Sequence, residues 1–136
     1  MRRVGGRGDD DPVPRSVLVV DDHAEYRISV RALLEADGFV VLGEAGTGAE
    51  AIRAVGRLSP DVVLLDIRLP DMDGTAAAAR IKGDPRTAHI PIVALTSLAM
   101  KGDRETLLGA GFDGYLEKPI SVREFPDQVR GFLVGC

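Results

Sequence analysis

The sequence predicts a doubly wound α/β fold, in which one five-stranded parallel sheet is covered by helices on both faces. Five short apolar runs alternate along the chain with stretches of helical periodicity, and this alternation is typical of parallel sheets with right-handed crossovers. Four of the runs are continuously apolar, as expected for strands that are buried on both faces. The chain of 136 residues is long enough for one domain with its own hydrophobic core.

The predicted strands are short segments rich in Val, Leu and Ile. They are SVLVV at 16–20, FVVLG at 39–43, DVVLL at 61–65, IPIVAL at 90–95 and GYL at 114–116. The last segment is the only one too short to count as a continuous apolar run. Buried parallel strands carry apolar residues on both sides, so the absence of strict alternation favours a covered sheet over a half-exposed one.

The first predicted helix covers 23–37. Tyr26, Val30, Leu33 and Leu34 recur there at a spacing close to 3.6 residues and form one apolar face. Gly38 follows at the position where a helix commonly ends in the left-handed conformation.

Three further helices are predicted at 47–58, 75–82 and 99–110, of which the first two are rich in alanine and amphipathic. The final helix is predicted to begin at Ser121, because Ser121-Val122-Arg123-Glu124 matches the capping-box pattern. Pro126 falls inside that helix. Either the helix begins nearer Pro126 or it is kinked there, because proline removes a backbone donor and crowds the preceding turn.

Residues 1–15 lack periodicity and are predicted to form a flexible tail before a single domain over 16–136. The chain has no apolar run long enough to cross a bilayer and no signal-peptide pattern at its start. Its only cysteine is Cys136, which excludes an internal disulfide. A cytoplasmic location is therefore expected. The net charge of −4 argues against nucleic-acid binding, which needs a basic face.

Polar residues follow four of the predicted strands. Asp21 and Asp22 follow the first, Asp66 the third, Thr96 the fourth and Lys118 the fifth. In an open α/β sheet, ligands bind at the carboxyl ends of the strands, so these side chains are expected at one edge. If the first and third strands are neighbours, the three acids repel one another unless a cation lies between them. Oxygen ligands without Cys or His favour Mg²⁺.

Other acids and histidines are predicted to have structural roles. Asp61 opens the third strand at the opposite edge, and Asp71 and Asp73 belong to a loop that ends in glycine. His23 has no second His or Cys at ligand spacing and is interpreted as a first-turn residue of the first helix. His89 precedes the fourth strand, away from the acids.

These motifs together resemble the receiver domains of two-component response regulators. The matching segments are VLVVDD, LLDIRLPDMDG, VALTS and GYLEKPI, in the family's order and at its spacing, and the resemblance extends over about residues 16–134. It implies a flavodoxin-like (βα)₅ fold with strand order 2-1-3-4-5. It also implies a signalling domain that assists its own phosphorylation and dephosphorylation rather than an enzyme with an external substrate.

The resemblance assigns a role to each strand-end residue. It implies that Asp66 is the phosphoacceptor and that Asp21, Asp22, Asp66 and the backbone carbonyl of Arg68 bind Mg²⁺.

By the same resemblance, Thr96 is the switch hydroxyl, Lys118 contacts the phosphoryl group and Tyr115 is the aromatic switch residue. Phosphorylation is then expected to change the face formed by the fourth helix, the fifth strand and the fifth helix.

The implied partners are a histidine kinase or a histidine phosphotransfer protein, together with a downstream protein target. The phosphodonor is expected to dock near the first helix and the loop after Pro119, where Ile28 and Ile120 are either apolar anchors or isolated surface residues. We expect a stand-alone regulator that neither binds nucleic acid nor inserts into a membrane. The alternative is the receiver portion of a hybrid kinase or of a larger regulator.

Three other functions compete with this interpretation. One is a pseudo-receiver that binds a partner without phosphorylation, and the complete set of strand-end residues argues against it. GTGAEA at 46–51 matches a dinucleotide-binding fingerprint, but it follows the second strand and explains neither the acid pair nor Lys118. A phosphatase of the haloacid-dehalogenase type needs an acid two residues after its nucleophile, and Arg68 occupies that position.

Overall fold

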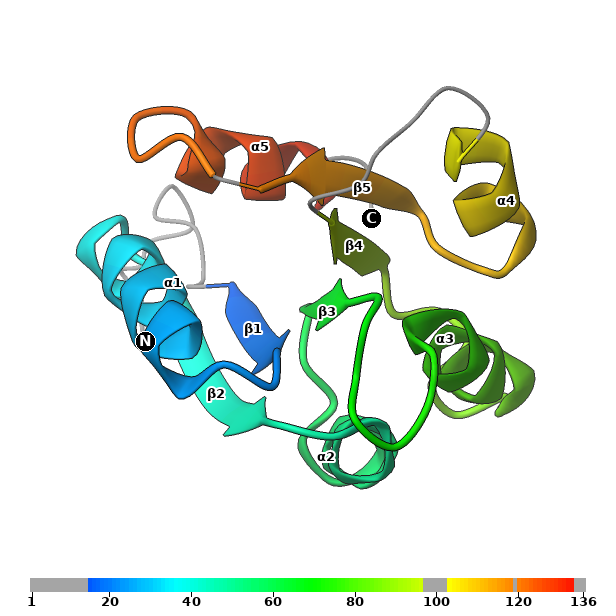
Figure 1. The fold of residues 1–136 in the computed structure, drawn as a ribbon. Coiled ribbons are helices and arrows are strands. Elements are labelled where there is room, and N and C mark those ends of the chain that lie inside the picture. The colour runs from blue at the N-terminus through cyan, green and yellow to red at the C-terminus, as the bar shows by residue number, and fades with distance from the viewer. Residues whose placement is uncertain (1–14, 97–102, 119, 134–136) are drawn as a thin grey trace.

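Five strands form a single parallel sheet in the order β2-β1-β3-β4-β5 in the computed structural model, which describes residues 15–96, 103–118 and 120–133 (Figure 1). This order confirms the predicted doubly wound fold. The strands are β1 (Ser16–Val20), β2 (Val40–Ala45), β3 (Val62–Asp66), β4 (Ile92–Thr96) and β5 (Gly114–Glu117). Every neighbouring pair is parallel, as expected when each strand is followed by a crossover helix.

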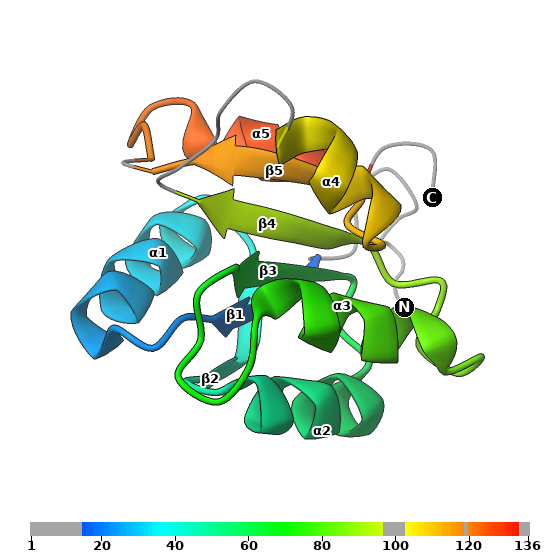
Figure 2. The ribbon, with the colours of Figure 1, turned by 45° about the vertical axis from the view of Figure 1, so that its right-hand side comes forward.

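Helices cover both faces of the sheet, as Figures 1 and 2 show. They are α1 (Ala24–Ala36), α2 (Gly48–Leu58), α3 (Gly74–Gly83), α4 (Asp103–Gly109) and α5 (Phe125–Gly131). The buried residues of α1 and α5 share one apolar cluster with the sheet, and those of α2, α3 and α4 share the other. The chain therefore forms three layers with two hydrophobic cores.

Strand β1 illustrates why the predicted strands are continuously apolar. Val17 and Val19 point into the core beneath α1 and α5, whereas Leu18 and Val20 point into the core beneath α2 and α3. All four side chains are fully buried. Burial of each such side chain contributes about 1.5–3 kcal/mol, so the central strands hold their carboxyl ends rigidly.

The predicted second strand is displaced along the chain. It was expected at 39–43 but runs from Val40 to Ala45. Gly38 adopts φ of 92°, the left-handed conformation predicted for the end of α1. The Phe39 N–H then donates to the Leu34 carbonyl at 3.0 Å, so residue 39 still belongs to the turn that ends the helix.

The last helix begins after Ser121 and nearer Pro126, in agreement with the first of the two predicted alternatives. Ser121 does accept a hydrogen bond through Oγ from the Glu124 N–H at 3.2 Å, but this contact closes a turn that precedes α5. Helix α5 begins at Phe125, which places Pro126 in its first turn. Proline is tolerated there because the first N–H groups of a helix have no intrahelical partner.

Some predicted segments lie partly outside the described residues. These are residues 1–14 of the tail and residues 99–102 of the fourth predicted helix, of which α4 represents the described part. Among the residues that are described, no helix is long and apolar enough to cross a bilayer. The strand order reverses between β1 and β3, and ligands of doubly wound sheets bind at such a point.

Candidate functional site

The structure brings the strand-end residues together at the carboxyl edge of the sheet. Asp21 directly follows β1 and Lys118 directly follows β5, whereas Asp66 and Thr96 are the last residues of β3 and β4. Asp66 pairs with Leu95 in the strand ladder, and Thr96 pairs with Glu117. Because Asp66 and Thr96 are held by the ladder itself, their backbones have little freedom to move.

Lys118, which follows β5, contacts the acids at the ends of β1 and β3. Its ammonium Nζ lies 2.7 Å from Asp21 Oδ2 and 3.7 Å from Asp66 Oδ2. Its backbone N–H donates to the Thr96 carbonyl at 2.8 Å, which continues the β4–β5 pairing. Asp21 is completely buried, so it depends on this ammonium for charge compensation.

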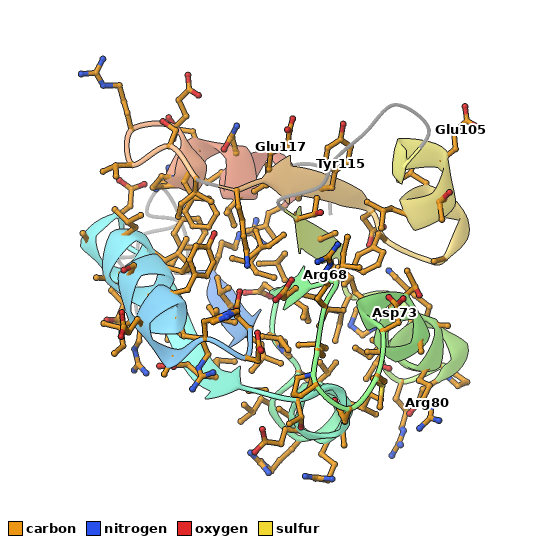
Figure 3. All side chains as sticks on the ribbon, viewed as in Figure 1. Arg68, Asp73, Arg80, Glu105, Tyr115 and Glu117 are labelled. Atoms are coloured by element: carbon orange, nitrogen blue, oxygen red, sulfur yellow. The ribbon has the colours of Figure 1, made fainter. Side chains whose placement is uncertain are left out.

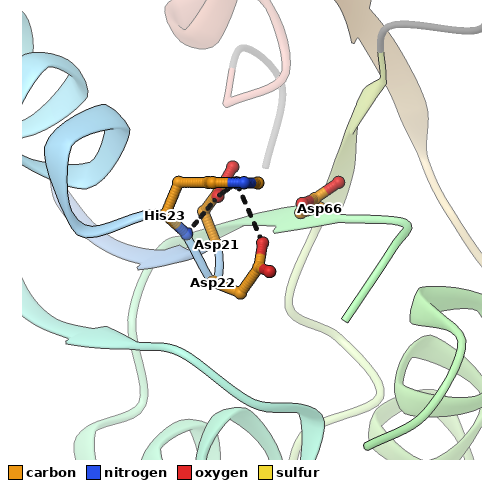
Figure 4. Close-up of side chains that lie close together, drawn as sticks. All are labelled: Asp21, Asp22, His23 and Asp66. Atoms are coloured by element: carbon orange, nitrogen blue, oxygen red, sulfur yellow. Dashed lines mark hydrogen bonds and ion pairs between the residues drawn. The ribbon is translucent and has the colours of Figure 1, made fainter. Parts of the chain in front are cut away.

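The three carboxylates of Asp21, Asp22 and Asp66, hereafter the acidic cluster, approach one another closely enough to share a cation. One ligand atom of each, together with one ring nitrogen of His23, lies within 4.8 Å of all the others (Figure 4). Two like charges at that separation repel by about 3 kcal/mol at an effective dielectric constant of 20. Carboxylate oxygens are the ligands that Mg²⁺ prefers, so these residues fit that ion.

His23 is closer to the acidic cluster than its predicted structural role suggests. It is the N-cap residue of α1, and its backbone N–H donates to Asp21 Oδ1 at 2.8 Å. Its ring nitrogen Nδ1 lies 3.2 Å from Asp21 Oδ1 and 3.0 Å from Asp22 Oδ1 (Figure 4). Ligand spacing of His and Cys along the chain does not reveal this contact. The informative signal was the position of His23 directly after the acid pair.

The environment of Asp66 favours its protonated form. Burial raises the pKa of the Asp66 carboxyl above its ordinary value, and the charges of Asp21 and Asp22 raise it further. The Arg68 N–H, which donates to Asp66 Oδ1 at 3.2 Å, and the Lys118 ammonium lower the pKa but do not cancel the increase. Without a cation, the ionised Asp66 side chain therefore destabilises the fold.

We predict that Asp66→Asn stabilises the cation-free protein by about 1–2 kcal/mol at neutral pH, because it removes one of three mutually repelling charges. The raised pKa of Asp66 means that its contribution to stability is largest at low pH. That contribution is lost as the pH rises through the folded-state pKa. Thermal unfolding in a chelator from pH 3.5 to 7 checks this. The gain should appear only toward neutral pH.

Asp73→Asn is the matched control for that experiment. Asp73 is the N-cap of α3 and accepts from the Thr75 N–H at 3.1 Å, and asparagine caps a helix about as well as aspartate. An equal gain in stability from Asp73→Asn would show that the effect does not come from the acidic cluster.

The loop after β3 is held against the site by a close approach of Gly74. The Gly74 N–H donates to the Ile67 carbonyl at 2.5 Å, and an isolated bridge joins Arg68 to Asp73. A Cβ atom on Gly74 would lie 2.6 Å from the Asp66 carbonyl oxygen and 2.7 Å from Ile67 Cα. Both of these neighbours are backbone atoms, so a side chain at position 74 forces the loop away from Asp66.

We predict that Gly74→Ala destabilises the protein by about 1–3 kcal/mol, the usual cost of overpacking. It should also weaken divalent-cation binding, because the displaced loop begins directly after Asp66 and carries the Arg68 backbone, whose N–H donates to Asp66 Oδ1 at 3.2 Å. Gly83→Ala is the control, since a Cβ there meets nothing within 4 Å at the end of α3. Denaturant unfolding and calorimetric titration with Mg²⁺ measure the two effects. Equal behaviour of the two variants would contradict this account of Gly74.

Asp71 has a larger structural role than a simple turn residue. Its carboxylate accepts from the N–H groups of Gly48 and Ala49 at 2.8 and 3.0 Å, which lowers the pKa of Asp71. These donors are at the N-terminus of α2, where a dinucleotide-binding fold holds the pyrophosphate. A side chain of the same chain thus occupies the place that the GTGAEA motif would reserve for a cofactor. In addition, β2 is an edge strand, away from the reversal of strand order.

Tyr115 lies on the same face of the sheet as Thr96. In the β4–β5 ladder Tyr115 pairs with Ala94 and Glu117 pairs with Thr96, so the four side chains are on one face. Tyr115 is partly buried and packs against the core beneath α3 and α4. Figure 3 shows Tyr115 and Glu117 projecting to the same side of β5. The predicted switch pair is therefore on adjacent strands and on the same face.

Tyr26 is a site residue that the sequence reasoning placed only in the apolar stripe of α1. The Lys118 ammonium lies over its ring, 4.3 Å from the centroid. Burial raises the pKa of Tyr26 to about 12, with smaller contributions from the negative charges of Asp21 and Asp66. The hydroxyl is therefore protonated at neutral pH, and it is buried without a hydrogen-bond partner in the described part of the chain.

Comparison with known proteins agrees with this geometry. The family model of the response regulator receiver domain matches residues 17–130. The polar-differentiation response regulator DivK of Brucella anthropi is 36% identical over 121 residues, which cover 89% of this chain and 98% of DivK. DivK of Brucella ovis is 35% identical over 119 residues, or 88% of this chain and 96% of that protein.

Solved structures show the same fold. A response regulator from Chloroflexus aurantiacus J-10-fl superposes with a TM-score of 0.82 at 29% identity, covering 89% of this chain and 98% of that one. The receiver domain of the sensor histidine kinase PA1611 from Pseudomonas aeruginosa PAO1 superposes with a TM-score of 0.80 at 32% identity, covering 89% of this chain and 98% of that one. That structure has a magnesium ion coordinated in its active site cleft. The chemotaxis response regulator CheY4 of Vibrio cholerae superposes with a TM-score of 0.83 at 25% identity, covering 89% of this chain and 100% of that one.

Proposed function

The chain belongs to the response regulator receiver domain family, and from this premise we propose that it accepts a phosphoryl group from a phosphohistidine onto Asp66. One observation carries the proposal. Asp66 ends a fully buried strand, with the Lys118 ammonium 3.7 Å away and the other acids of the acidic cluster beside it. A rigid carboxylate next to compensating positive charge is what in-line phosphoryl transfer requires.

In the proposed reaction an Asp66 carboxylate oxygen attacks phosphorus as the P–N bond to the donor histidine breaks. The electron pair of that bond returns to the imidazole, and the product is an aspartyl phosphate. Lys118 compensates charge on the transferring oxygens, and the Arg68 N–H, now bonded to Asp66 Oδ1 at 3.2 Å, is positioned to donate to them.

Mg²⁺, when bound, supplies the remaining positive charge at the transferring group. We assign its protein ligands to the acidic cluster and to the backbone carbonyl of Arg68. The magnesium ion in the PA1611 receiver domain supports this assignment. The chain assists its own phosphorylation and its own dephosphorylation, and it has no external substrate in this proposal.

The output of the reaction is proposed to be a change of the face formed by α4, β5 and α5. An aspartyl phosphate has a charge near −2 and attracts hydrogen-bond donors. The Thr96 hydroxyl, at the end of the strand next to β3, moves toward it. Tyr115 then turns into the space that Thr96 leaves, because both side chains lie on the same face of adjacent strands. A downstream protein recognises the altered face.

The direct test is phosphorylation of the wild-type chain by a small phosphodonor such as acetyl phosphate. Intact mass measurement should show one added phosphoryl group in the presence of Mg²⁺ and none in the presence of a chelator. Peptide mapping should locate it at Asp66. A phosphoryl group on any other residue, or no gain of mass, would refute the proposal.

The phosphodonor protein is proposed to dock over α1 and the turn before α5, with Ile28 as one apolar anchor. Ile28 is 64% exposed and Val122 is 70% exposed. Ile120, the second anchor that the sequence predicts, is partly buried and packs against the core beneath α1 and α5. We therefore propose Val122 in place of Ile120 as the second apolar anchor, because Val122 is exposed and Ile120 packs against the core.

We predict that Ile28→Glu slows phosphotransfer from a histidine phosphotransfer protein about tenfold, because it puts a charge into an apolar contact. Phosphorylation by acetyl phosphate should be unaffected, since Ile28 is not part of the acidic cluster. Val40→Glu is a matched control, an exposed aliphatic residue on the edge strand β2. Stopped-flow transfer assays compare the variants. If Ile28→Glu and Val40→Glu behave alike with the protein donor, Ile28 is an isolated surface residue.

We further propose that the receiver itself transmits the signal, as a stand-alone regulator. The chain spans 98% of the DivK relative from Brucella anthropi, which supports this role. The likeness to the receiver domain of a sensor histidine kinase keeps a hybrid-kinase context as the alternative. The mass of the polypeptide that contains this sequence, measured in an extract of its native source, distinguishes the two.

A further inference from the structure

The Lys118 ammonium has an aromatic neighbour in addition to its two carboxylates. Its Nζ lies 2.7 Å from Asp21 Oδ2, 3.7 Å from Asp66 Oδ2 and 4.3 Å from the centroid of the Tyr26 ring. A lysine side chain has four rotatable bonds and behaves as a mobile point charge. A ring face within about 6 Å attracts such a cation and limits the directions in which it can move.

The surroundings of Tyr26 show which part of its side chain matters. Its ring packs against the core beneath α1 and α5, so it is held in place by apolar contacts. Its hydroxyl is buried and has no hydrogen-bond partner among the described residues. An unpartnered buried hydroxyl is a cost to the fold. A hydrogen bond of the hydroxyl therefore does not explain why a tyrosine lies at this position, whereas the contact of its ring face with Lys118 does.

We propose that Tyr26 is a positioning residue for Lys118, whose ammonium it holds beside Asp66 through the face of its ring. The role deepens the proposed function and rests on it. Asp21 alone attracts the ammonium away from the phosphoacceptor, since it is the nearer carboxylate by 1.0 Å, the difference between 3.7 and 2.7 Å. The ring supplies an uncharged third contact, which does not compete with the phosphoryl group for the positive charge.

The first test compares Tyr26→Leu with Tyr26→Phe in phosphorylation by acetyl phosphate. Loss of the ring should slow the reaction about three- to thirtyfold, the range that corresponds to a cation–π contact. Phenylalanine keeps the ring face and should restore the rate to within about twofold of wild type. An equal loss in both variants would assign the effect to the hydroxyl and overturn the proposal. Tyr26→Met replaces the leucine variant if the latter does not fold.

The second test asks whether Tyr26 acts through Lys118. A double-mutant cycle of Tyr26→Leu and Lys118→Met is measured by denaturant unfolding in a chelator. The combined loss in the folding equilibrium constant should be at least about threefold smaller than the product of the single losses. Additive losses would mean that Tyr26 only fills space, and would overturn the proposal.

The unfolding cycle does not depend on phosphorylation, so the two proposals can fail separately. If wild type gains no phosphoryl group but the cycle shows coupling, the phosphoacceptor function is wrong and the positioning contact stands. If wild type is phosphorylated and the cycle is additive, the function stands and the role of Tyr26 is wrong.

Discussion

Asp66→Asn should abolish phosphorylation by acetyl phosphate, a loss of at least about 10³-fold in rate. Asparagine has the shape of aspartate and can still accept from the Arg68 N–H through Oδ1, so the loop geometry is expected to survive. It has no carboxylate oxygen with which to attack phosphorus. The variant should also be more stable than wild type without a cation, so misfolding is not expected to cause the loss.

Asp21 should not substitute for Asp66 as the nucleophile. Asp21 is completely buried, with one oxygen accepting from the Lys118 ammonium and the other from the His23 N–H. Each of its oxygens therefore already accepts a hydrogen bond within the fold, and the buried carboxylate is not open to an incoming phosphodonor. Intact mass measurement after incubation with Mg²⁺ and the phosphodonor is the assay. Asp73→Asn, which changes an exposed acid of the same loop, should be phosphorylated like wild type. Normal phosphorylation of Asp66→Asn would remove the basis of the proposed function.

Lys118→Met should slow phosphorylation about 10²- to 10³-fold, the usual effect of removing one group that stabilises the transition state. Among the residues that the structure describes, Lys118 is the one cation within salt-bridge distance of Asp66. Methionine is an unbranched side chain of nearly the same length and removes the ammonium with its charge and its donors. Lys118→Arg keeps the charge and should recover part of the rate. A rate for Lys118→Met within a factor of three of wild type would contradict the role assigned to the ammonium.

The same substitution should change the response to Mg²⁺. Without Lys118 the buried Asp21 carboxylate loses its partner at 2.7 Å, which costs about 2 kcal/mol, less than for a fully buried pair because Lys118 is 18% exposed. The ammonium also repels a divalent cation bound to the acidic cluster. Mg²⁺ should therefore raise the melting temperature of Lys118→Met more than that of wild type. Thermal unfolding with and without Mg²⁺ measures this. An equal rise in melting temperature for the two proteins would argue against repulsion between the ammonium and the bound cation.

The strand-end residues could be located from the sequence because each follows a recognisable strand. A continuous apolar run identifies a buried parallel strand, and all parallel strands end at the same edge. Asp66 and Thr96 needed no further information. The proximity of Asp21 to Asp66 needed one more fact, the adjacency of β1 and β3, which the family resemblance implied and the strand order confirmed.

Two contacts and one difference in burial were not predictable from local pattern. Tyr26 has the spacing of a core residue on α1, and nothing in the sequence says that a lysine from the far end of the chain lies over its ring. Asp71 has the composition of a turn, although its partners are at the start of α2. Ile120 and Val122 are both apolar residues of one loop. In the structure Ile120 is partly buried against the core beneath α1 and α5, whereas Val122 is 70% exposed.

The sequence by itself determined the sheet, the edge at which its polar residues gather and the family to which the chain belongs, because burial on two faces and strand-end position are local properties. The tertiary structure decided which partners the charges have. The ammonium of Lys118 is 97 residues from Asp21 along the chain, and it is nearer to Asp21 than to Asp66. Electrostatic energy depends on distance and burial, and both are set when α1, β3 and β5 pack together.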